Sequence, residues 1–307
     1  MTDIHLRPTE CAICATKGNA TELYAANFTS SDLSPAVFSA RRLPDRIHYR
    51  MVRCNTCGLV RSDPVADSDV LSQLYAASTF DYGAELDNLA ATYGKYLQRL
   101  SRYMPSKNAL LEIGCGNGFV LAEARRLGYT DVRGVEPSRS AIDSAPNGIR
   151  EKIVCSMMVP GLFPPETFDS VCLFQVLDHI LDPVQLLRTC YQLLKPSGVL
   201  LCLNHNVEAL SARLMKSRSP IIDIEHTYLY SPVTMGRLLA TSGFQVRESR
   251  KAWNRYSLRY LSHLVPLPAS VKRRLLSAVE ASPLGRISAW VPLGNLYCIA
   301  QRPSAGE

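Results

Sequence analysis

Apolar residues in the middle of the chain alternate between short continuous runs and a helix-like spacing. An apolar run at residues 109–113 precedes a glycine-rich turn, residues 119–127 have helical spacing, and a second apolar run covers 132–135. A strand, a tight turn, a helix and a second strand form a βαβ unit, whose two strands run parallel. The sequence therefore predicts an α/β fold built on a buried parallel sheet.

The same pattern continues on both sides of this unit. Further apolar runs begin at Ile153, Phe168, Val199, Phe244 and Leu296, and helical spacing recurs in several of the stretches between them. Strands that alternate with helices in this way form a doubly wound sheet, and these runs predict seven strands in all. Before the unit, residues 68–104 have helical spacing, and we expect a helical connector that covers a site.

Cysteines bring the first chemistry into the picture. The chain has ten, and four of them form the pairs Cys11/Cys14 and Cys54/Cys57. Two residues between the cysteines of a pair let both thiolates reach one ion, and Gly58 suits the positive φ of such a turn. Two pairs supply a closed tetrahedral site, so a structural zinc ion is expected. The alternative is two unrelated reduced pairs or a redox dithiol.

Composition narrows the class of protein. Of the 307 residues 47% are hydrophobic and 20% charged, which is typical of a globular chain and excludes a disordered one. No apolar run approaches the roughly 18 residues needed to span a bilayer. The first residues have no apolar stretch of signal-peptide type, so a cytoplasmic protein is expected. The net charge of +7 permits anionic ligands such as nucleotides or nucleic acid.

The glycine-rich turn indicates a nucleotide. Gly114, Gly116 and Gly118 let the backbone approach a ligand closely, and Glu136, at the tip of the second strand, can accept hydrogen bonds from both hydroxyls of a ribose. The pyrophosphate fingerprint of dinucleotide-binding proteins has its third glycine at the sixth position of the motif, where this chain has Phe119. The sequence therefore favours a nucleoside ligand over a pyridine dinucleotide.

The order apolar-Glu-x-Gly-x-Gly-x-Gly resembles motif I of class I S-adenosylmethionine-dependent methyltransferases. The run Leu193–Leu201 is similar to the turn that leads into the fifth strand of that family. The resemblance covers about residues 106–302 and implies a seven-stranded Rossmann-like sheet. This family often has an acid near the adenine amino group, but the corresponding residues 153–158 contain none. The cofactor-binding residues implied are Glu112, Gly114, Cys115, Gly116, Asn117, Gly118, Glu136, Pro137, Ser156, Met157 and Gln175.

Histidines are the candidates for a catalytic base, because the imidazole pKa lies near neutral pH. His179 follows the fourth strand and His226 precedes the helix that begins near Ser231; similar methyltransferases often have a histidine at both positions. We expect Asp223 or Glu225 to orient His226. His205, after the fifth strand, is expected to be structural.

The zinc pairs and the methyltransferase motifs together resemble bacterial methyltransferases of sugar and secondary-metabolite pathways. The expected division is a zinc ribbon at 1–67, a helical connector or lid at 68–105, and a Rossmann-like domain at 106–307. A basic helical insertion is expected at about 247–292, and nine Lys and Arg lie between residues 247 and 286. The expected acceptor is an oxygen or carbon of a small or carrier-linked metabolite. The alternatives are an RNA methyltransferase that grips phosphates with its basic residues, and a non-catalytic nucleoside-binding protein.

Overall fold

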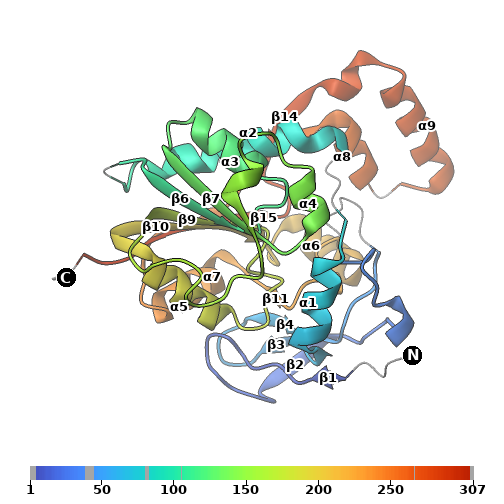
Figure 1. Cartoon of the computed structure of the whole chain (residues 1–307). Coiled ribbons are helices and arrows are strands. Elements are labelled where there is room, and N and C mark those ends of the chain that lie inside the picture. Colours follow the sequence, from blue (N-terminus) through green and yellow to red (C-terminus); the bar gives the residue numbers. More distant parts are fainter. Residues whose placement is uncertain (1–4, 39–44, 80–82, 105, 266, 305–307) are drawn as a thin grey trace.

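The computed structural model describes residues 5–38, 45–79, 83–104, 106–265 and 267–304. A seven-stranded sheet with the order β12-β15-β10-β9-β6-β7-β8 forms its centre (Figure 1). This confirms the predicted α/β fold. Its strands are β6 (Ala109–Ile113), β7 (Asp131–Glu136), β8 (Ile153–Cys155), β9 (Phe168–Phe174), β10 (Leu194–His205), β12 (Gln245–Lys251) and β15 (Asn295–Gln301).

The strands of this sheet are parallel except for β15. Strand β15 lies antiparallel between β10 and β12, and every other neighbouring pair is parallel. All five residues of β6 are buried, which explains why the sequence shows a continuous apolar run there rather than an alternation. The parallel order brings the carboxyl ends of β6, β7, β9 and β10 to one edge of the sheet, where ligands bind in such folds.

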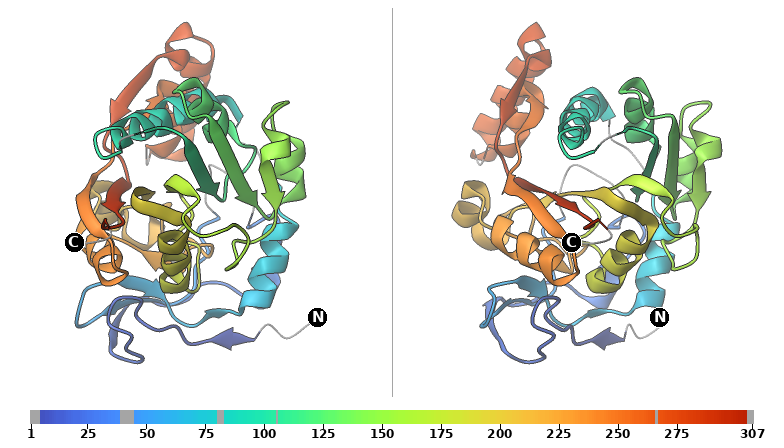
Figure 2. Two further views of the ribbon diagram at one scale, coloured as in Figure 1. Left: turned by 60° about the vertical axis from the view of Figure 1, so that its left-hand side comes forward. Right: turned by 90° about the vertical axis from the view of Figure 1, so that its left-hand side faces the viewer.

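Helices cover both faces of the sheet (Figures 1 and 2). Leu97 and Val120 belong to the apolar core on one face, and Leu187 and Leu238 to the core on the other. Burial of each such side chain stabilises the fold by about 2 kcal/mol. The helices are α1 (Ser68–Ala76), α2 (Leu86–Leu100), α3 (Phe119–Arg126), α4 (Arg139–Asp143), α5 (Pro183–Leu193), α6 (Leu210–Met215), α7 (Pro232–Thr241), α8 (Leu258–Leu264) and α9 (Ala269–Glu280). No helix in the described ranges is both long and apolar enough to cross a bilayer.

The stretch predicted as a helical connector contains two helices, α1 and α2. Asp67 caps the start of α1 by accepting a hydrogen bond from the Val70 backbone N–H. Helix α1 ends at Ala76 and α2 begins at Leu86, after Gly83 with a φ of +50°. The spacing of apolar residues alone did not reveal this break, because both helices keep the same period.

The N-terminal segment and the main body share a small sheet with the order β11-β4-β3-β2. Three of its strands come from the segment with the cysteines, and the fourth comes from the chain before α7. Ser62 reinforces this junction, because its hydroxyl donates to the His226 carbonyl at 2.7 Å. The strands of the N-terminal segment are β1 (Leu6–Arg7), β2 (Ala20–Tyr24), β3 (Met51–Cys54), β4 (Val60–Ser62) and β5 (Val65–Ala66), and β11 is Tyr228–Leu229.

A second extension projects from the opposite end of the molecule (Figures 1 and 2). It consists of α8, α9 and the paired strands β13 (Asn254–Ser257) and β14 (Ser288–Val291). The insertion predicted at 247–292 therefore begins later than expected, since residues 247–251 belong to the sheet strand β12. The sequence predicted only the start of this strand, near Phe244, because the outward side chains that follow are basic.

Glu248 of β12 is the centre of a buried polar cluster. Its carboxylate accepts hydrogen bonds from Arg99 at 2.7 Å, from the Tyr103 hydroxyl at 2.8 Å and from the Tyr297 hydroxyl at 2.6 Å. Burial raises the pKa of this carboxyl, but the hydrogen bonds from Arg99, Tyr297 and Tyr103 outweigh burial and lower the pKa to about 2. The ionised carboxylate therefore ties β12 to α2 and β15.

Replacement of Glu248 by Gln is expected to lower the free energy of unfolding at pH 7 by about 2 kcal/mol. A carboxyl with a lowered pKa stabilises the fold above its unfolded pKa, near 4.5, and this stabilisation is lost as pH falls towards 2. Urea unfolding between pH 2 and 7 should therefore show a flatter pH dependence for Glu248→Gln. The exposed Glu10 pairs with Lys17, and Glu10→Gln is the control expected to leave the curve unchanged.

Candidate active site

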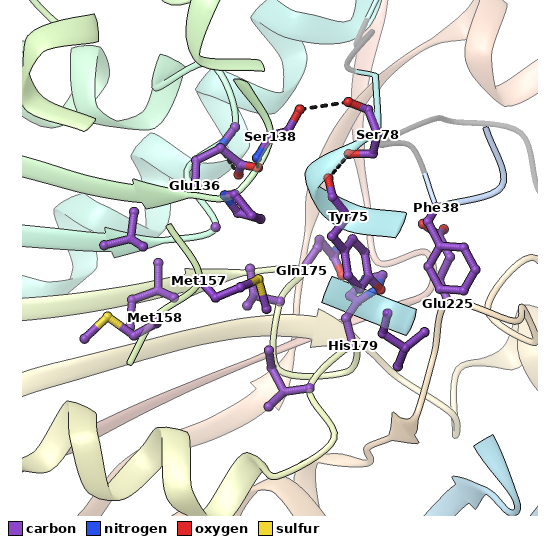
Figure 3. A pocket seen from close by; sticks show the side chains of 18 of the residues that line it. Phe38, Tyr75, Ser78, Glu136, Ser138, Met157, Met158, Gln175, His179 and Glu225 are labelled. Carbon is purple, nitrogen blue, oxygen red and sulfur yellow. Dashed lines mark hydrogen bonds between the residues drawn. The ribbon is translucent and has the colours of Figure 1, made fainter. Parts of the chain in front are cut away.

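A cavity of about 600 Å³ opens at the carboxyl ends of β6, β7, β9 and β10 (Figure 3). Residues that end these strands line it, and they include Gly114, Glu136, Gln175 and His205. The cavity therefore lies where a doubly wound sheet is expected to bind its ligand. Its volume falls within the usual range for small-molecule sites.

The glycine turn after β6 forms one wall of the cavity. Gly114, Gly116 and Gly118 have φ values of +70°, +54° and +71°, in the left-handed region that favours glycine. A Cβ atom at Gly114 would lie 2.5 Å from Cγ2 of Val176, so a larger residue would also collide with the turn after β9. The backbone of this turn consequently reaches the cavity edge without side chains in the way.

Glu136 ends β7 and points its carboxylate towards the same wall (Figure 3). One carboxylate oxygen accepts a hydrogen bond from the Gly116 N–H at 2.9 Å and the other from the Ser138 N–H at 2.8 Å. These bonds leave lone pairs on both oxygens for a ligand. Burial raises the pKa of Glu136, and the two backbone donors oppose that shift. The backbone thus fixes the orientation of the carboxylate.

Gln175 supplies an unpartnered polar atom at the cavity wall. It has a φ of +56°, and its side-chain Oε1 is buried without a hydrogen-bond partner among the described residues. A buried amide oxygen without a partner is costly unless a ligand or water satisfies it. Gln175, which the sequence resemblance implied as a cofactor contact, is therefore suited to accept a hydrogen bond from a bound molecule.

The wall beyond Glu136 contains the remaining implied contacts that reach the cavity. Pro137, Ser156 and Met157 line it together with Met158. The Ser156 hydroxyl donates to the Met157 carbonyl at 2.7 Å, which leaves its oxygen as an acceptor. Two methionines and a hydroxyl oxygen suit the edge and face of a flat ring system.

Four residues that the resemblance implied do not line the cavity. Glu112 and Cys115 are buried, and burial raises the pKa of both well above the ordinary value. Asn117 accepts a hydrogen bond from the Phe119 N–H at 3.3 Å, and Gly118 is the N-cap of α3. These four residues shape the turn from behind, and only Gly114 and Gly116 of the turn line the cavity.

Three histidines surround one buried carboxylate at the other end of the cavity. His179, His205 and His226 all line it, and Asp178 lies beneath them. The ring centroid of His226 lies 4.9 Å from that of His179 and 4.7 Å from that of His205. The sequence identified His179 and His226 but missed the central Asp178, although it directly precedes His179.

Each ring has its own hydrogen-bond partner. His179 Nδ1 contacts the Tyr75 hydroxyl at 2.9 Å, and His226 Nδ1 donates to the Ile221 carbonyl at 2.9 Å. The Ile221 carbonyl thus orients His226, where the sequence suggested Asp223 or Glu225. Burial lowers the pKa of His179 and lowers that of His226 further, so both rings are neutral at pH 7.

Helix α1 and residues on either side of it form a further wall of the cavity. Tyr75, Ser78 and Phe38 line this wall (Figure 3). The Ser138 hydroxyl donates to the Ser78 carbonyl at 2.8 Å and so ties the segment after α1 to the tip of β7. The part of the chain expected to be a lid therefore contacts both the glutamate end and the histidine end of the cavity.

The four paired cysteines come together away from this cavity. The Sγ atoms of Cys11, Cys14, Cys54 and Cys57 all lie within 4.8 Å of one another. Burial raises the pKa of the Cys54 thiol, but the N–H groups of Cys57 and Thr56 outweigh burial and lower the pKa to about 6. Four sulfur donors this close, with backbone N–H groups directed at a thiolate, fit the ligand set of a tetrahedral zinc ion.

The two cysteine turns have matching backbones. The residue after each pair has a positive φ, +51° at Ala15 and +79° at Gly58. In each turn its N–H donates to the carbonyl of the first cysteine, at 2.8 Å for Ala15 and 3.0 Å for Gly58. The backbone prediction for Gly58 is thus confirmed, and Ala15 adopts the same conformation without being glycine.

The chain is similar in sequence to known methyltransferases. The ubiquinone biosynthesis O-methyltransferase of Caulobacter vibrioides is 34% identical over 113 residues, which cover 33% of this chain and 43% of that protein. The mitochondrial ubiquinone biosynthesis O-methyltransferase of Homo sapiens is 29% identical over 171 residues, covering 49% and 46%. The chain thus matches less than half of the length of these relatives. A solved SAM-dependent methyltransferase from Archaeoglobus fulgidus is 22% identical, covers 71% of this chain and 97% of that one, and has a TM-score of 0.46.

The methyltransferase domain family matches residues 85–249. This range begins just before α2, contains the glycine turn, Glu136 and all three histidines, and ends within β12. It covers more than half of the 307 residues. The protein is therefore a member of the methyltransferase domain family.

Proposed function

We propose that the protein transfers a methyl group from S-adenosylmethionine to an oxygen atom of a small or carrier-linked metabolite. The observation that carries this proposal is the carboxylate of Glu136, fixed by two backbone N–H groups beside the glycine turn and facing a cavity. A carboxylate in this place suits the two hydroxyls of a ribose. Membership of the methyltransferase domain family supports the same ligand.

The residues of the cavity fit this cofactor along its length. Glu136 would hold the ribose, Gln175 would accept a hydrogen bond, and Ser156, Met157 and Met158 would contact the adenine ring. S-adenosylmethionine supplies an electrophilic methyl group on a positively charged sulfur. The chain itself aligns the acceptor with that group and excludes water, since methyl transfer needs little else from a protein.

The histidine end of the cavity is the proposed acceptor site. Phe38, Leu71 and Leu181 supply apolar walls, and His179 and His226 supply polar groups. A wall of this kind suits an apolar molecule with a hydroxyl to be methylated. The two relatives described above are named as O-methyltransferases, which supports oxygen over carbon as the acceptor atom. We propose that a histidine of this cluster removes the hydroxyl proton.

We also propose that the four-cysteine site holds a structural zinc ion. Four thiolates leave no open coordination position, so the ion would stabilise the N-terminal segment rather than take part in chemistry. The same segment supplies Phe38 to the cavity and shares a sheet with the strand after His226. The proposed zinc would therefore support the cavity indirectly.

Calorimetry on the purified, zinc-loaded protein tests the proposed cofactor. S-adenosylmethionine and S-adenosylhomocysteine are each expected to bind with measurable heat, and NAD is expected to give none. Binding of NAD in place of both nucleosides would overturn the proposal. Measurement of RNA affinity at low salt tests the RNA alternative, which requires affinity that falls steeply with salt concentration.

A further inference from the structure

Asp178 and His205 form the shortest polar contact between a carboxylate and a ring in the histidine cluster. His205 Nδ1 lies 2.8 Å from Asp178 Oδ2, and the Asn204 side-chain amide donates to Asp178 Oδ1 at 2.8 Å. Asp178 has no exposed surface and comes from the turn after β9, whereas His205 ends the neighbouring strand β10. Two adjacent strands of the sheet thus hold the carboxylate against the ring.

This contact fixes the proton on the His205 ring. Burial raises the pKa of Asp178, but the charge that His179 carries at low pH and the hydrogen bond from His205 outweigh burial and hold this pKa well below its usual range, so the carboxylate is ionised at pH 7. An ionised carboxylate only accepts hydrogen bonds, so Nδ1 must carry the hydrogen. In the neutral ring Nε2 is then left with a lone pair, which is the state that a general base needs.

The three rings differ in what their second nitrogen faces. His179 Nε2 lies 3.7 Å from Asp178 Oδ1 and His226 Nε2 lies 4.0 Å from Asp178 Oδ2. Because their Nδ1 atoms contact Tyr75 and Ile221, both nitrogens of each ring face protein groups. For Nε2 of His205 the described part of the chain supplies no hydrogen-bond or ion-pair partner.

His205 is also the most exposed of the three histidine side chains. The side chain of His205 is 25% exposed, that of His179 is 18% exposed and that of His226 is 6% exposed. His205 lines the cavity from the end of β10, so its free nitrogen is the one that a bound hydroxyl reaches without displacing a protein contact. The sequence had assigned His205 a structural role because nothing near it in the chain marks it as a base.

We propose that His205 is the general base of this site and that Asp178 is the residue that positions it. This inference rests on the proposed function. Nε2 of His205 takes the proton of the acceptor hydroxyl, the oxygen forms its bond to the methyl carbon, and the carbon–sulfur electron pair stays on sulfur. The protonated ring then returns its proton to solvent. His179 and His226 complete the wall around the acceptor.

Chemical modification tests the assignment without a known acceptor. Diethylpyrocarbonate reacts with the free nitrogen of a neutral imidazole, and peptide mass spectrometry gives the rate at each histidine. With S-adenosylhomocysteine present at pH 7, His205 is expected to react roughly tenfold faster than His179 or His226. His263, which does not line the cavity, is the internal reference. Faster modification of His226 or His179 would overturn the proposal.

Two variants separate positioning from mere packing. Asp178→Asn is expected to slow modification of His205 roughly tenfold, because the carboxylate that fixes the tautomer is gone. In this variant nitrogen NMR should show His205 as a mixture of tautomers, whereas the wild type should show protonated Nδ1 alone. Asp169 pairs with Lys195 and does not line the cavity, so Asp169→Asn is the matched control and should leave the His205 rate nearly unchanged. An unchanged rate and tautomer in Asp178→Asn would exclude Asp178 as the positioning residue.

Calorimetry with S-adenosylhomocysteine, run on the same samples, separates this inference from the proposed function. If S-adenosylhomocysteine bound the wild type and both variants while diethylpyrocarbonate modified His205 slowly, the base assignment would be wrong and the cofactor proposal would stand. Absence of binding to the wild type would remove the proposed function itself. His205→Gln should keep its affinity for S-adenosylhomocysteine within about threefold, because Glu136 lies at the other end of the cavity.

Discussion

Replacement of Glu136 by Ala is expected to raise the Kd for S-adenosylmethionine by roughly 100- to 10,000-fold. A hydrogen bond to a charged group contributes about 1.5–3 kcal/mol, and the carboxylate is proposed to accept one from each ribose hydroxyl. In the wild type the N–H groups of Gly116 and Ser138 donate to this carboxylate, so its loss also leaves both groups without this acceptor. Calorimetry with S-adenosylmethionine gives the change directly.

Glu136→Gln separates charge from shape in this prediction. The amide keeps the size of the side chain but donates where the carboxylate accepts, so a loss of affinity of roughly tenfold or more is expected. Glu151 is exposed and does not line the cavity, and Glu151→Ala is the control for a change in net charge. If Glu136→Ala bound S-adenosylmethionine as tightly as the wild type, the ribose contact would be wrong.

The elements of the fold were predictable where their signals are local. The apolar run of β6, the glycine turn and the acid at the end of β7 lie within 28 residues, and their order alone predicted the parallel sheet. Capping is equally local, since the Asp182 side chain accepts a hydrogen bond from the Gln185 N–H at the start of α5. Helix capping and strand periodicity involve residues that are only a few positions apart in the chain, so both can be recognised from the sequence.

The proposed base was not predictable in the same way. Asp178 and His205 are 27 residues apart, and they meet only because β9 and β10 are neighbours in a particular register. The sequence shows a histidine after each strand but not which ring faces a carboxylate. The contact between Ser62 and His226 spans 164 residues and depends on a two-residue strand, β11, too short for any periodic signal. The register between β9 and β10 therefore determines which histidine contacts Asp178, and the sequence does not reveal that register.

Replacement of Cys54 by Ser is expected to release the proposed zinc ion and to destabilise the N-terminal segment by several kcal/mol. Zinc binding to four thiolates contributes directly to folding, and a serine hydroxyl is a poor substitute ligand. Metal analysis after dialysis against a chelator should find zinc in the wild type and none in the variant. Cys155 is exposed and lies outside the cluster, so Cys155→Ser should keep the metal.

The effect of Cys54→Ser should extend to the histidine end of the cavity. Cys54 ends β3, β3 pairs with β4, and β4 pairs with Tyr228 and Leu229, two residues after His226. Disorder of β3 would remove the support beneath His226, whereas Glu136 and the glycine turn belong to the central sheet. We therefore expect faster hydrogen exchange at residues 226–229 and nearly unchanged affinity for S-adenosylhomocysteine. If Cys54→Ser also abolished binding of S-adenosylhomocysteine, the cysteine segment and the central sheet would fold as one cooperative unit.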